Sequence, residues 1–478
     1  MKGIDRISVI RHKSKINKNW RHDDLFRILR KDDIWATAYK NIKNNKIYLP
    51  QEIKVLPLTD IVLVRLKRLR EKVITEDYNF KTIEKQDITE LNNRGKPLKF
   101  LIENDIIVQE VIRMILEVIY EPYSSSQIVK CRQKVGLHDA LKYIELKFPL
   151  VNWIIQKETQ NLDSVIEQKQ LCKILKKKIN DTRFLNLISK LLKSRIFQPT
   201  HFIYSDSKIS QKSLILSTFV NIYYHPLDEW VERKAKILPK KVGKHRKINS
   251  ANPENIQPKI SYVRYLDDWL IGINGDLTSV NKLKMDTHRF LRMELKQAIE
   301  PVSIKTTNLH SGKVHFLRYE IYSSRVPIIQ SPSQFESWTT HSIKIPLRFD
   351  IPMKSILQKL EERGYIKKLT KGYRSISKGN YTNLSDIIIV KHFRKVWLRI
   401  AAYYSGCTNL SKLQYIHYLL HISCAMTLSH RHRSTIKKIF TKYGKTLTVT
   451  NSYNKTKFPY RDKWIFTDRV WQIIKRLD

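Results

Sequence analysis

Two adjacent aspartates, Asp267 and Asp268, stand between two short apolar and aromatic runs, 261–265 and 269–273. Such runs around two polar positions predict strand, tight turn and strand, with both carboxylates at the tip. Carboxylates directed at one point repel each other, but they bind Mg²⁺ well, because that ion prefers oxygen ligands and shares them with phosphates. The chemistry that the pair could do is metal-assisted nucleotidyl transfer. The alternative is an ordinary hairpin whose aspartates simply favour the turn.

The charge balance of the whole chain indicates the kind of partner. Among 478 residues, 89 Lys and Arg oppose 44 Asp and Glu, a net charge of +45. Because this excess is spread along the chain, it indicates a large polyanionic partner, and nucleic acid is favoured over a membrane surface. A hydrophobic content of 42% and an aromatic content of 10% exclude a disordered basic tail and predict well-filled cores.

Cysteine and histidine spacing gives no sign of a zinc site. The chain has four cysteines, Cys131, Cys172, Cys407 and Cys424. They form no Cys-x-x-Cys pair, so neither a zinc ribbon nor a disulfide framework is expected. The simplest expectation is buried or unreactive thiols in a reducing compartment. His417 and His421 have the spacing of a zinc pair, but no glutamate lies between them and no third ligand is evident. They are therefore expected to be helix-surface histidines.

Nothing in the sequence predicts a membrane span or an import signal. No apolar run reaches the ~20 residues that a membrane helix needs. The first 20 residues are basic but lack the apolar core of a signal peptide. The abundance of Lys, Ile and Asn suits an AT-rich organelle genome, which would also account for the missing transit peptide.

Hydrophobic periodicity predicts the elements that position the aspartate pair. Apolar residues at helical spacing predict a helix over 23–42 and another over 106–120 that stops before Pro122. A strand is expected to begin at Trp153, and the strongly basic stretch 233–247 is expected to be an exposed loop leading to the hairpin.

Motifs spread over most of residues 20–447 resemble group II intron-encoded reverse transcriptases and maturases. Those of the fingers and palm are Asp105 to Glu110, Arg132 with His138, Ala140 and Leu141, Trp153 onward, Asn221 to Tyr223, Tyr265 to Asp268, Phe290-Leu291, Lys305-Thr306 and Phe316 to Tyr319. Each motif is weak alone, but they occur in the family's order and spacing. The resemblance implies an α+β fold, with right-hand polymerase fingers and palm followed by an all-α thumb and maturase (X) domain.

The C-terminal third resembles the maturase domain of the same family. The matching segments are Ala402 to Ser405, Tyr415, Tyr418 to Leu420, Ser423 to Ser429, His432 and Tyr443-Gly444. On physical grounds they form a helical bundle in which one face packs and others are cationic. Side chains that pair with phosphates or stack on unpaired bases are expected to bind RNA. These candidates are Arg431, His432, Arg433, Lys437, Tyr403 and Tyr404.

The resemblance also assigns polymerase roles. It makes Asp267 and Asp268 ligands of Mg²⁺, if polymerase activity is retained, and places Arg132 and Gln211 near the nucleotide. The family's third metal ligand is an Asp, which aligns with Glu158 here, or with Asp163 if the register slips.

Departures from the family pattern make efficient DNA synthesis the weaker expectation. Glu158 carries its carboxylate one methylene further out, and a shift of ~1 Å can cost ~100-fold in rate. Lys212 stands where the family has a glycine that lets backbone approach the nucleotide, and Arg318 stands at another glycine position.

The sequence therefore predicts an intron maturase that binds group II-type intron RNA and assists its splicing in an organelle, plastid rather than mitochondrion. An active RNA-directed DNA polymerase and a general RNA-binding protein are the alternatives. Whether the protein forms a homodimer is left open, and no membrane or zinc is expected. The predicted divisions are 1–90 (N-terminal helical extension and start of the fingers), 91–330 (fingers and palm), 331–450 (thumb and X domain) and 451–478 (short basic tail).

Overall fold

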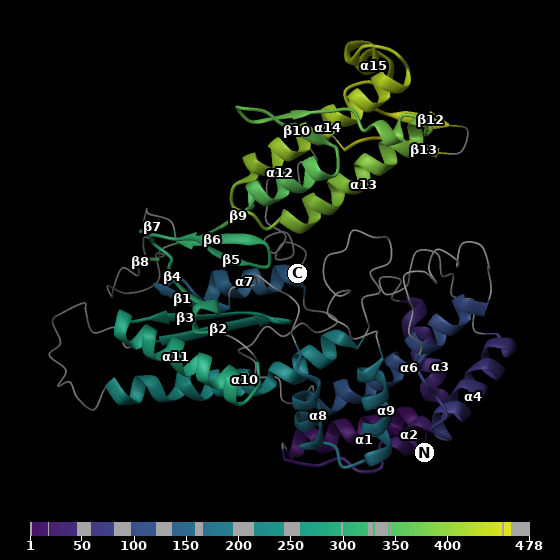
Figure 1. The fold of residues 1–478 in the computed structure, drawn as a ribbon, viewed down its shortest axis with the longest axis vertical. Helices are drawn as coiled ribbons and strands as arrows, with labels where there is room; N and C mark the ends of the chain where they lie inside the picture. Colours follow the sequence, from purple (N-terminus) through teal and green to yellow (C-terminus); the bar gives the residue numbers. More distant parts are fainter. Residues whose placement is uncertain are drawn as a thin grey trace, which may run out of the picture. The chain divides into compact units, whose positions relative to one another are not determined.

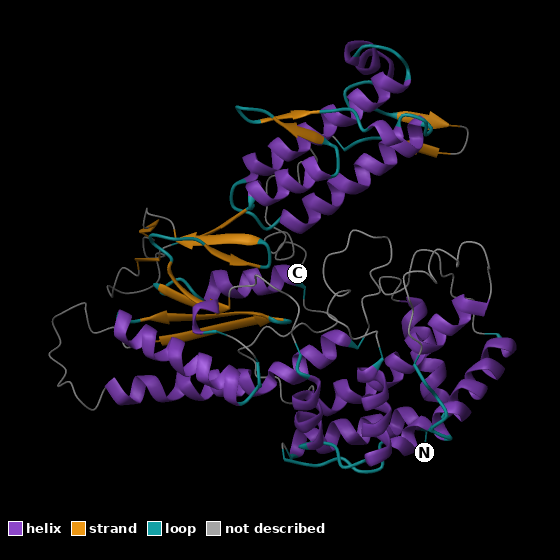
Figure 2. Ribbon diagram, in the orientation of Figure 1, coloured by secondary structure: helices purple, strands orange, loops and turns teal. Residues whose placement is uncertain are grey.

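The computed structural model (Figure 1) describes residues 2–17, 19–44, 59–80, 97–120, 136–157, 166–194, 215–242, 259–297, 300–323, 328–329, 343–344, 346–451 and 454–459. The chain divides into two compact units. Unit 1 comprises Met1–Val135, Ile155–Ile271 and Gly275–Thr306, and unit 2 comprises Gly136–Ile154, Gly272–Asn274 and Thr307–Asp478. Helices and strands both occur (Figure 2), so the predicted α+β class is confirmed.

Unit 1 consists mainly of helices. They are α1 (Gly3–Ile16), α2 (Phe26–Leu29), α3 (Asp32–Asn44), α4 (Asp60–Ile74), α6 (Pro97–Tyr120), α8 (Gln168–Lys176), α9 (Thr182–Lys193), α10 (Leu216–Val242) and α11 (Leu277–Met293). Among its described side chains, α6 is buried almost throughout 105–119, and α1 and α3 pack on it. The predicted helix over 106–120 is confirmed as the second half of α6, which ends at Tyr120.

Two predicted elements of unit 1 are corrected. The segment 23–42 forms two helices, α2 and α3, instead of one. A new helix starts at Asp32 because acidic residues in a first turn favour a helix N-terminus, and Trp35 Nε1 bonds back to the Leu29 carbonyl at 2.8 Å. The first part of the expected loop 233–247 is helical, since α10 continues to Val242. The Lys, Arg, Ala and Leu residues of this part are good helix formers, and their propensity outweighed the proline and the charge.

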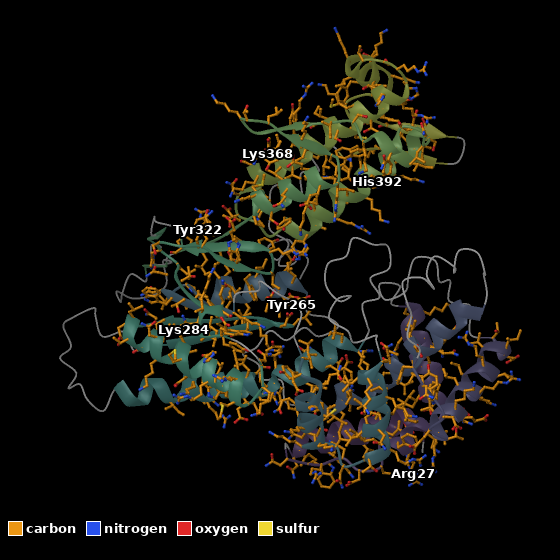
Figure 3. The ribbon with its side chains drawn as sticks, in the orientation of Figure 1. Arg27, Tyr265, Lys284, Tyr322, Lys368 and His392 are labelled. Atoms are coloured by element: carbon orange, nitrogen blue, oxygen red, sulfur yellow. The ribbon has the colours of Figure 1, made fainter. Side chains whose placement is uncertain are left out.

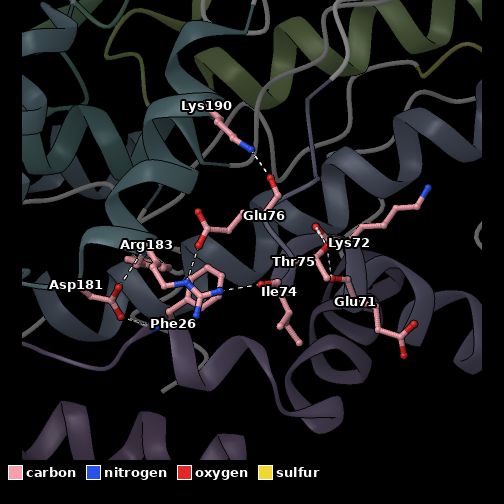
Figure 4. Close-up of polar contacts among 10 residues, drawn as sticks. Phe26, Glu71, Lys72, Ile74, Thr75, Glu76, Asp181, Arg183 and Lys190 are labelled. Atoms are coloured by element: carbon pink, nitrogen blue, oxygen red, sulfur yellow. Dashed lines mark hydrogen bonds and ion pairs between the residues drawn. The ribbon is translucent and has the colours of Figure 1, made fainter.

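A clasp centred on Arg183 ties α9 to the end of α4 and to α2 (Figure 4). The guanidinium of Arg183 donates to Glu76 at 2.6 Å and to the Ile74 carbonyl at 2.8 Å, and it lies 4.1 Å above the Phe26 ring centroid. Asp181 caps α9 and also accepts a bond from the Phe26 backbone at 2.7 Å. These contacts join three segments that are distant in sequence.

The aspartate hairpin belongs to a four-stranded sheet of order β2-β3-β1-β4. Its strands are β1 (Trp153–Lys157), β2 (Lys259–Tyr265), β3 (Asp268–Asn274) and β4 (Ile304–Asn308), the last following a 3₁₀ turn, Pro301–Ser303. Helix α10 packs on β2, and α10 and α11 lie along one face of the sheet (Figure 1). The predicted strands around the aspartate pair and from Trp153 are confirmed.

Unit 2 combines short strands with a helical bundle. Its helices are α7 (Leu137–Lys147), α12 (Met353–Glu362), α13 (Asp386–Tyr404), α14 (Leu410–Arg431) and α15 (Ile436–Tyr443), with a 3₁₀ turn at Gly379–Tyr381. Its strands are β5 (Val314–Phe316), β6 (Tyr319–Ser323), β7 (Ile328–Ile329), β8 (Ile343–Lys344), β9 (Leu347–Asp350), β10 (Ile366–Lys368), β11 (Tyr373–Ser375), β12 (Val449–Asn451) and β13 (Asn454–Thr456). Helices α13 and α14 pack together, and α14 also contacts α15 and β11.

The prediction of an all-α segment over 331–450 is wrong in one respect, because short strands lie between its helices. Strand β9 pairs with β6 in register Ile321 to Phe349, and β10 pairs with β11. These strands are two to four residues long. Such short runs give almost no alternating pattern, so the sequence did not signal them.

Arg318 stands in the two-residue turn between β5 and β6, at a position that favours glycine. Its φ is +59°, and that of Leu317 is +48°. A side chain costs roughly 1–2 kcal/mol in this left-handed region. Arg318→Gly is therefore expected to raise the free energy of unfolding by about 1 kcal/mol, measured by urea denaturation. The same substitution at Arg374, an exposed residue of β11, is expected to be neutral or destabilising. If both substitutions changed the free energy of unfolding equally, backbone strain at Arg318 would be contradicted.

The expectation that His417 and His421 lie on the helix surface is wrong. Each is 8% exposed, and their rings pack against Phe458 at centroid distances of 5.2 Å. His417 Nε2 lies 2.7 Å from the Pro459 carbonyl, and His421 Nε2 lies 2.9 Å from the Lys445 carbonyl. The pair therefore fastens the segment after α15 onto α14.

Buried neutral histidines make stability depend on pH. Burial, with the charge of His417 adding to it, lowers the pKa of His421 to about 4, and burial beside Lys13 lowers that of His22 to about 4. Between pH ~6.5 and ~4 the unfolded chain takes up protons that the folded chain does not, so stability falls as the pH falls through this range. Each histidine contributes a loss on the order of 3 kcal/mol.

This loss is expected as a lower urea midpoint at about pH 4.5 than at about pH 7. A His421→Gln variant, which does not titrate there, is expected to show a shallower dependence than the parent protein. If the urea midpoint depended on pH equally in both proteins, His421 would not be a source of the pH dependence.

Candidate functional site

The aspartate pair is carried by a tight turn with an unusual backbone. Tyr265 ends β2 (Figure 3), Leu266 and Asp267 form the turn, and Asp268 begins β3. Leu266 has a φ of +58°, a conformation that costs a leucine roughly 1–2 kcal/mol. Burial raises the pKa of Asp267 above its ordinary value, although its own backbone N–H, Lys157 and Arg264 oppose the rise. The turn must therefore be held by neighbouring groups.

Arg264 is the group that holds it. Its side chain is 0% exposed, and one terminal nitrogen donates to the Leu266 carbonyl at 2.7 Å and to Asn221 Oδ1 at 3.0 Å. Its other two nitrogens form a bidentate pair with Asp228 of α10 at 2.8 and 2.7 Å. A planar guanidinium can bond a carboxylate and a carbonyl at once, which makes it suited to locking a turn to a helix.

Asp228 is shared with a second buried donor. The Tyr262 hydroxyl donates to Asp228 Oδ1 at 2.9 Å, and burial together with the Asp228 charge raises the Tyr262 pKa well above its ordinary value. Burial alone would lower the pKa of Arg264, but Asp228 outweighs it and the pKa is raised. Neither Arg264 nor Asp228 was predicted to have a role. The available signal was one charged residue within an apolar strand.

Several candidate residues lie outside the residues that the structure describes. These are Glu158, Asp163, Arg132 and Gln211. Within the described part of the chain, no group of three or more His, Cys, Asp or Glu side chains could hold a metal ion. The polymerase roles of these residues therefore stay predictions.

Asp386, at the start of α13, gathers two of the candidate RNA-binding side chains. Arg431 Nε and His432 Nε2 each lie 2.9 Å from its carboxylate, and the Tyr443 hydroxyl donates to it at 2.6 Å. Burial raises the pKa of Asp386, but the bonds from Tyr443 and His432 outweigh this and the net pKa is lowered. Arg431 and His432 therefore brace α13 against the end of α14, while Arg433 is exposed with a φ of +45°.

Tyr403 is half-buried and Tyr404 is buried in unit 2. Tyr404 is 6% exposed, and its ring centroid lies 5.2 Å from that of Tyr319. The Tyr403 hydroxyl donates to the Leu317 carbonyl at 3.0 Å, while its carbonyl accepts from the Tyr319 hydroxyl and lies 3.1 Å from His138 Nε2. In this arrangement the two tyrosines fix α13 to the β5–β6 hairpin and to α7.

Exposed cations of unit 2 gather on α13 and α15. Lys391, Lys395 and Arg399 are exposed at intervals of four residues, so they form a row along one face of α13, called here the α13 row. On α15 and just before it, exposed cations are Arg433, Lys437, Lys438 and Lys442. Figure 3 marks His392, next to the row, and Lys368 on the β10–β11 hairpin, whose exposed cations are Lys367, Lys368, Lys371 and Arg374.

The charge of the α13 row acts on its neighbour. Burial first, and then the positive charges of Lys378, Lys395 and Arg399, lower the pKa of His392 to about 4. The Tyr365 hydroxyl lies 2.7 Å from His392 Nε2, and Lys378 Nζ lies 4.3 Å above the Tyr365 ring centroid. The face thus combines a strong positive potential with aromatic rings.

A cavity of about 370 Å³ adds to the basic surface of unit 1. It is lined by Arg65, Arg68, Leu69, Lys72, Asp77, Tyr78, Asn79, Asn104 and Asp105. The Tyr78 hydroxyl bonds to Asp105 at its floor, and both side chains are buried. No local sequence pattern marks this cavity, because its lining comes from two separated stretches, 65–79 and 104–105.

Comparison with known proteins places the chain. A family model described as type II intron maturase matches residues 345–476. The chain is 24% identical to the group II intron-encoded protein LtrA of Lactococcus lactis subsp. cremoris over 94% of this chain and 83% of that protein. It is 23% identical to maturase K of Physcomitrium patens over 92% and 90%, and 25% identical to an uncharacterized 91 kDa protein in the cob intron of Schizosaccharomyces pombe over 91% and 58%.

The C-terminal part of unit 2 is thus a type II intron maturase domain. This match and these relatives support a member of the group II intron maturase family, as the resemblance implied. It spans little more than half the length of some of the relatives that it matches. In the described residues, no helix has the length and apolar character required to cross a membrane.

Proposed function

We propose that this protein binds group II-type intron RNA and assists its splicing. The observation that carries the proposal is the position of the α13 row, formed by Lys391, Lys395 and Arg399, inside the segment that matches the maturase model. A row of exposed cations meets the phosphates of a folded RNA, and the net charge of +45 supplies long-range attraction. The splicing chemistry would belong to the RNA, so the protein needs shape and charge complementarity.

The proposal assigns different tasks to the candidate residues. Arg433 and Lys437 are exposed and are proposed to contact phosphates directly. Arg431 and His432 form ion pairs with Asp386. Their effect on RNA binding is therefore proposed to be indirect, through the position of the surface that carries Arg433 and Lys437. Tyr403 and Tyr404 are proposed to support the fold beneath it.

The second candidate function is RNA-directed DNA synthesis, favoured by the position of Asp267 and Asp268 at the tip of a braced hairpin. It would need Mg²⁺ at this pair and a third acidic ligand, for which Glu158 and Asp163 are the candidates. The third candidate function is that of a general RNA-binding protein, which would need neither Mg²⁺ nor a third acidic ligand.

We also propose that the protein acts in an organelle, on the basis of its composition and of its relatives. The relatives include an intron protein of Schizosaccharomyces pombe and maturase K of Physcomitrium patens at similar identity. Relatives of both kinds match about equally well, so they support an organelle, and the plastid is the finer proposal.

Competition binding with purified protein tests the maturase function. Labelled host intron is challenged with unlabelled host intron or with an unrelated folded RNA of the same length, at a fixed salt concentration. The host intron is expected to compete about 10³-fold better or more, the lower range of specific over non-specific nucleic-acid binding. Equal competition by the two RNAs would favour the general RNA-binding protein.

A further inference from the structure

The register of the central sheet determines what faces the aspartate pair. Strand β1 neighbours β3, and the residue before β1 is bonded to the end of β3, with Asn152 N lying 3.3 Å from the Ile273 carbonyl. Asn152 Nδ2 also donates to Asn274 at 3.0 Å, so the start of β1 lies at the end of β3. The charges of Asp267 and Asp268 act on Lys157, so the end of β1 lies at the start of β3, and the two strands run in opposite directions. Counting five residues along each strand from the Asn152–Ile273 bond places Lys157 opposite Asp268.

Residues directly opposite each other on antiparallel strands project from the same face, with Cβ atoms about 5 Å apart. Lys157, the last residue of β1, therefore projects toward the tip of the hairpin. Its side chain is partly buried, and this burial lowers its pKa overall, although the charges of Asp267 and Asp268 oppose the change. The Lys157 charge acts in turn on Asp267. Lys157 and the aspartate pair thus share one partly desolvated site.

The family implies Mg²⁺ at this pair, but the residues present do not fit the ion. Mg²⁺ requires near-octahedral oxygen ligands and keeps several waters. An ammonium beside the same carboxylates repels a divalent cation and competes with it for their lone pairs, and this repulsion is stronger in a protein than in bulk water because the effective dielectric constant is lower.

We propose that the ammonium of Lys157 takes the place of a divalent cation as the counter-charge of Asp267 and Asp268. The hairpin is then electrically balanced by the protein itself and keeps its shape without metal. A rigid, metal-independent palm can present a constant surface to RNA at any Mg²⁺ concentration. This inference concerns metal binding only, so it stands or falls separately from the splicing role.

Mn²⁺ binding to the full-length protein tests the inference, with free Mn²⁺ followed by electron paramagnetic resonance. The parent protein is expected to show no saturable site that depends on Asp267 and Asp268. Lys157→Met, which removes the charge and keeps the length, is expected to gain one saturable site, with an affinity for Mn²⁺ more than about tenfold above the residual binding of the parent protein. Adding Asp267→Asn and Asp268→Asn to this variant is expected to abolish the site.

Two controls keep the outcome decisive. Lys173→Met removes an equal charge from an exposed position of α8 and is expected to leave Mn²⁺ binding unchanged. Lys157→Arg keeps the charge and is expected to gain no site. A Mn²⁺ site in the parent protein that disappears in the Asp267→Asn, Asp268→Asn double variant would overturn the inference, even if Lys157→Met fails to fold. A folded Lys157→Met variant without a new site would also overturn it.

Discussion

Arg264→Met is expected to lower the free energy of unfolding by about 3–5 kcal/mol, the usual cost of breaking a buried ion pair by removing one partner. The substitution leaves the buried Asp228 carboxylate without its bidentate partner, at a side chain that is only 2% exposed. It also frees the Leu266 carbonyl, so the left-handed turn loses its support. Urea denaturation of the parent protein and the variant measures the change.

The matched control for this prediction is Arg27→Met. Arg27 is 57% exposed and pairs with Asp24 at 3.5 Å, and an exposed ion pair of this kind contributes about 0–1 kcal/mol. A double variant, Arg264→Met with Asp228→Leu, removes both charges and is expected to recover part of the loss. If Arg264→Met and Arg27→Met cost the same, the buried network is not what braces the hairpin.

Replacing Lys391, Lys395 and Arg399 together by glutamine is expected to weaken intron binding by about tenfold or more and to reduce its salt dependence. Each lost phosphate contact removes about 0.7–0.9 from the slope of log affinity against log salt, so the slope should fall by roughly 2–3. All three side chains are exposed, so the fold should be unaffected. Filter binding over a series of salt concentrations measures both quantities.

The control is a triple variant with the same loss of charge on α11, at Lys282, Arg289 and Arg292, which are also exposed. It is expected to change the slope much less, because the proposal places the phosphate contacts on the maturase domain. Equal changes in the two triple variants would show that bulk charge, rather than the α13 row, controls binding.

The elements that could be predicted from the sequence are those with strong, continuous periodicity. The second half of α6 repeats apolar residues over 106–120, and the two strands around Asp267 and Asp268 are rich in aromatic and β-branched residues. Local pattern alone was sufficient there. The division of 23–42 into two helices was missed because both halves bury residues at helical spacing and only the acidic start of α3 marks the break.

The residues that brace and balance the candidate site could not be predicted, because their roles depend on contacts between distant segments. Arg264 meets Asp228 across 36 residues, and Lys157 reaches the hairpin only through the register of β1 and β3. The burial of His417 and His421 likewise depends on the segment after α15. Sequence spacing carries no information about such pairings.

The measurement that tests the central claim most directly is a splicing assay of the host intron run beside primer extension on an RNA template, with the same purified protein and Mg²⁺. We expect that splicing is promoted, that no cDNA appears, and that an Asp267→Asn, Asp268→Asn variant that remains folded still promotes splicing. Synthesis of cDNA that depends on Asp267 and Asp268, without any effect on splicing, would contradict the maturase function and identify the protein as a polymerase.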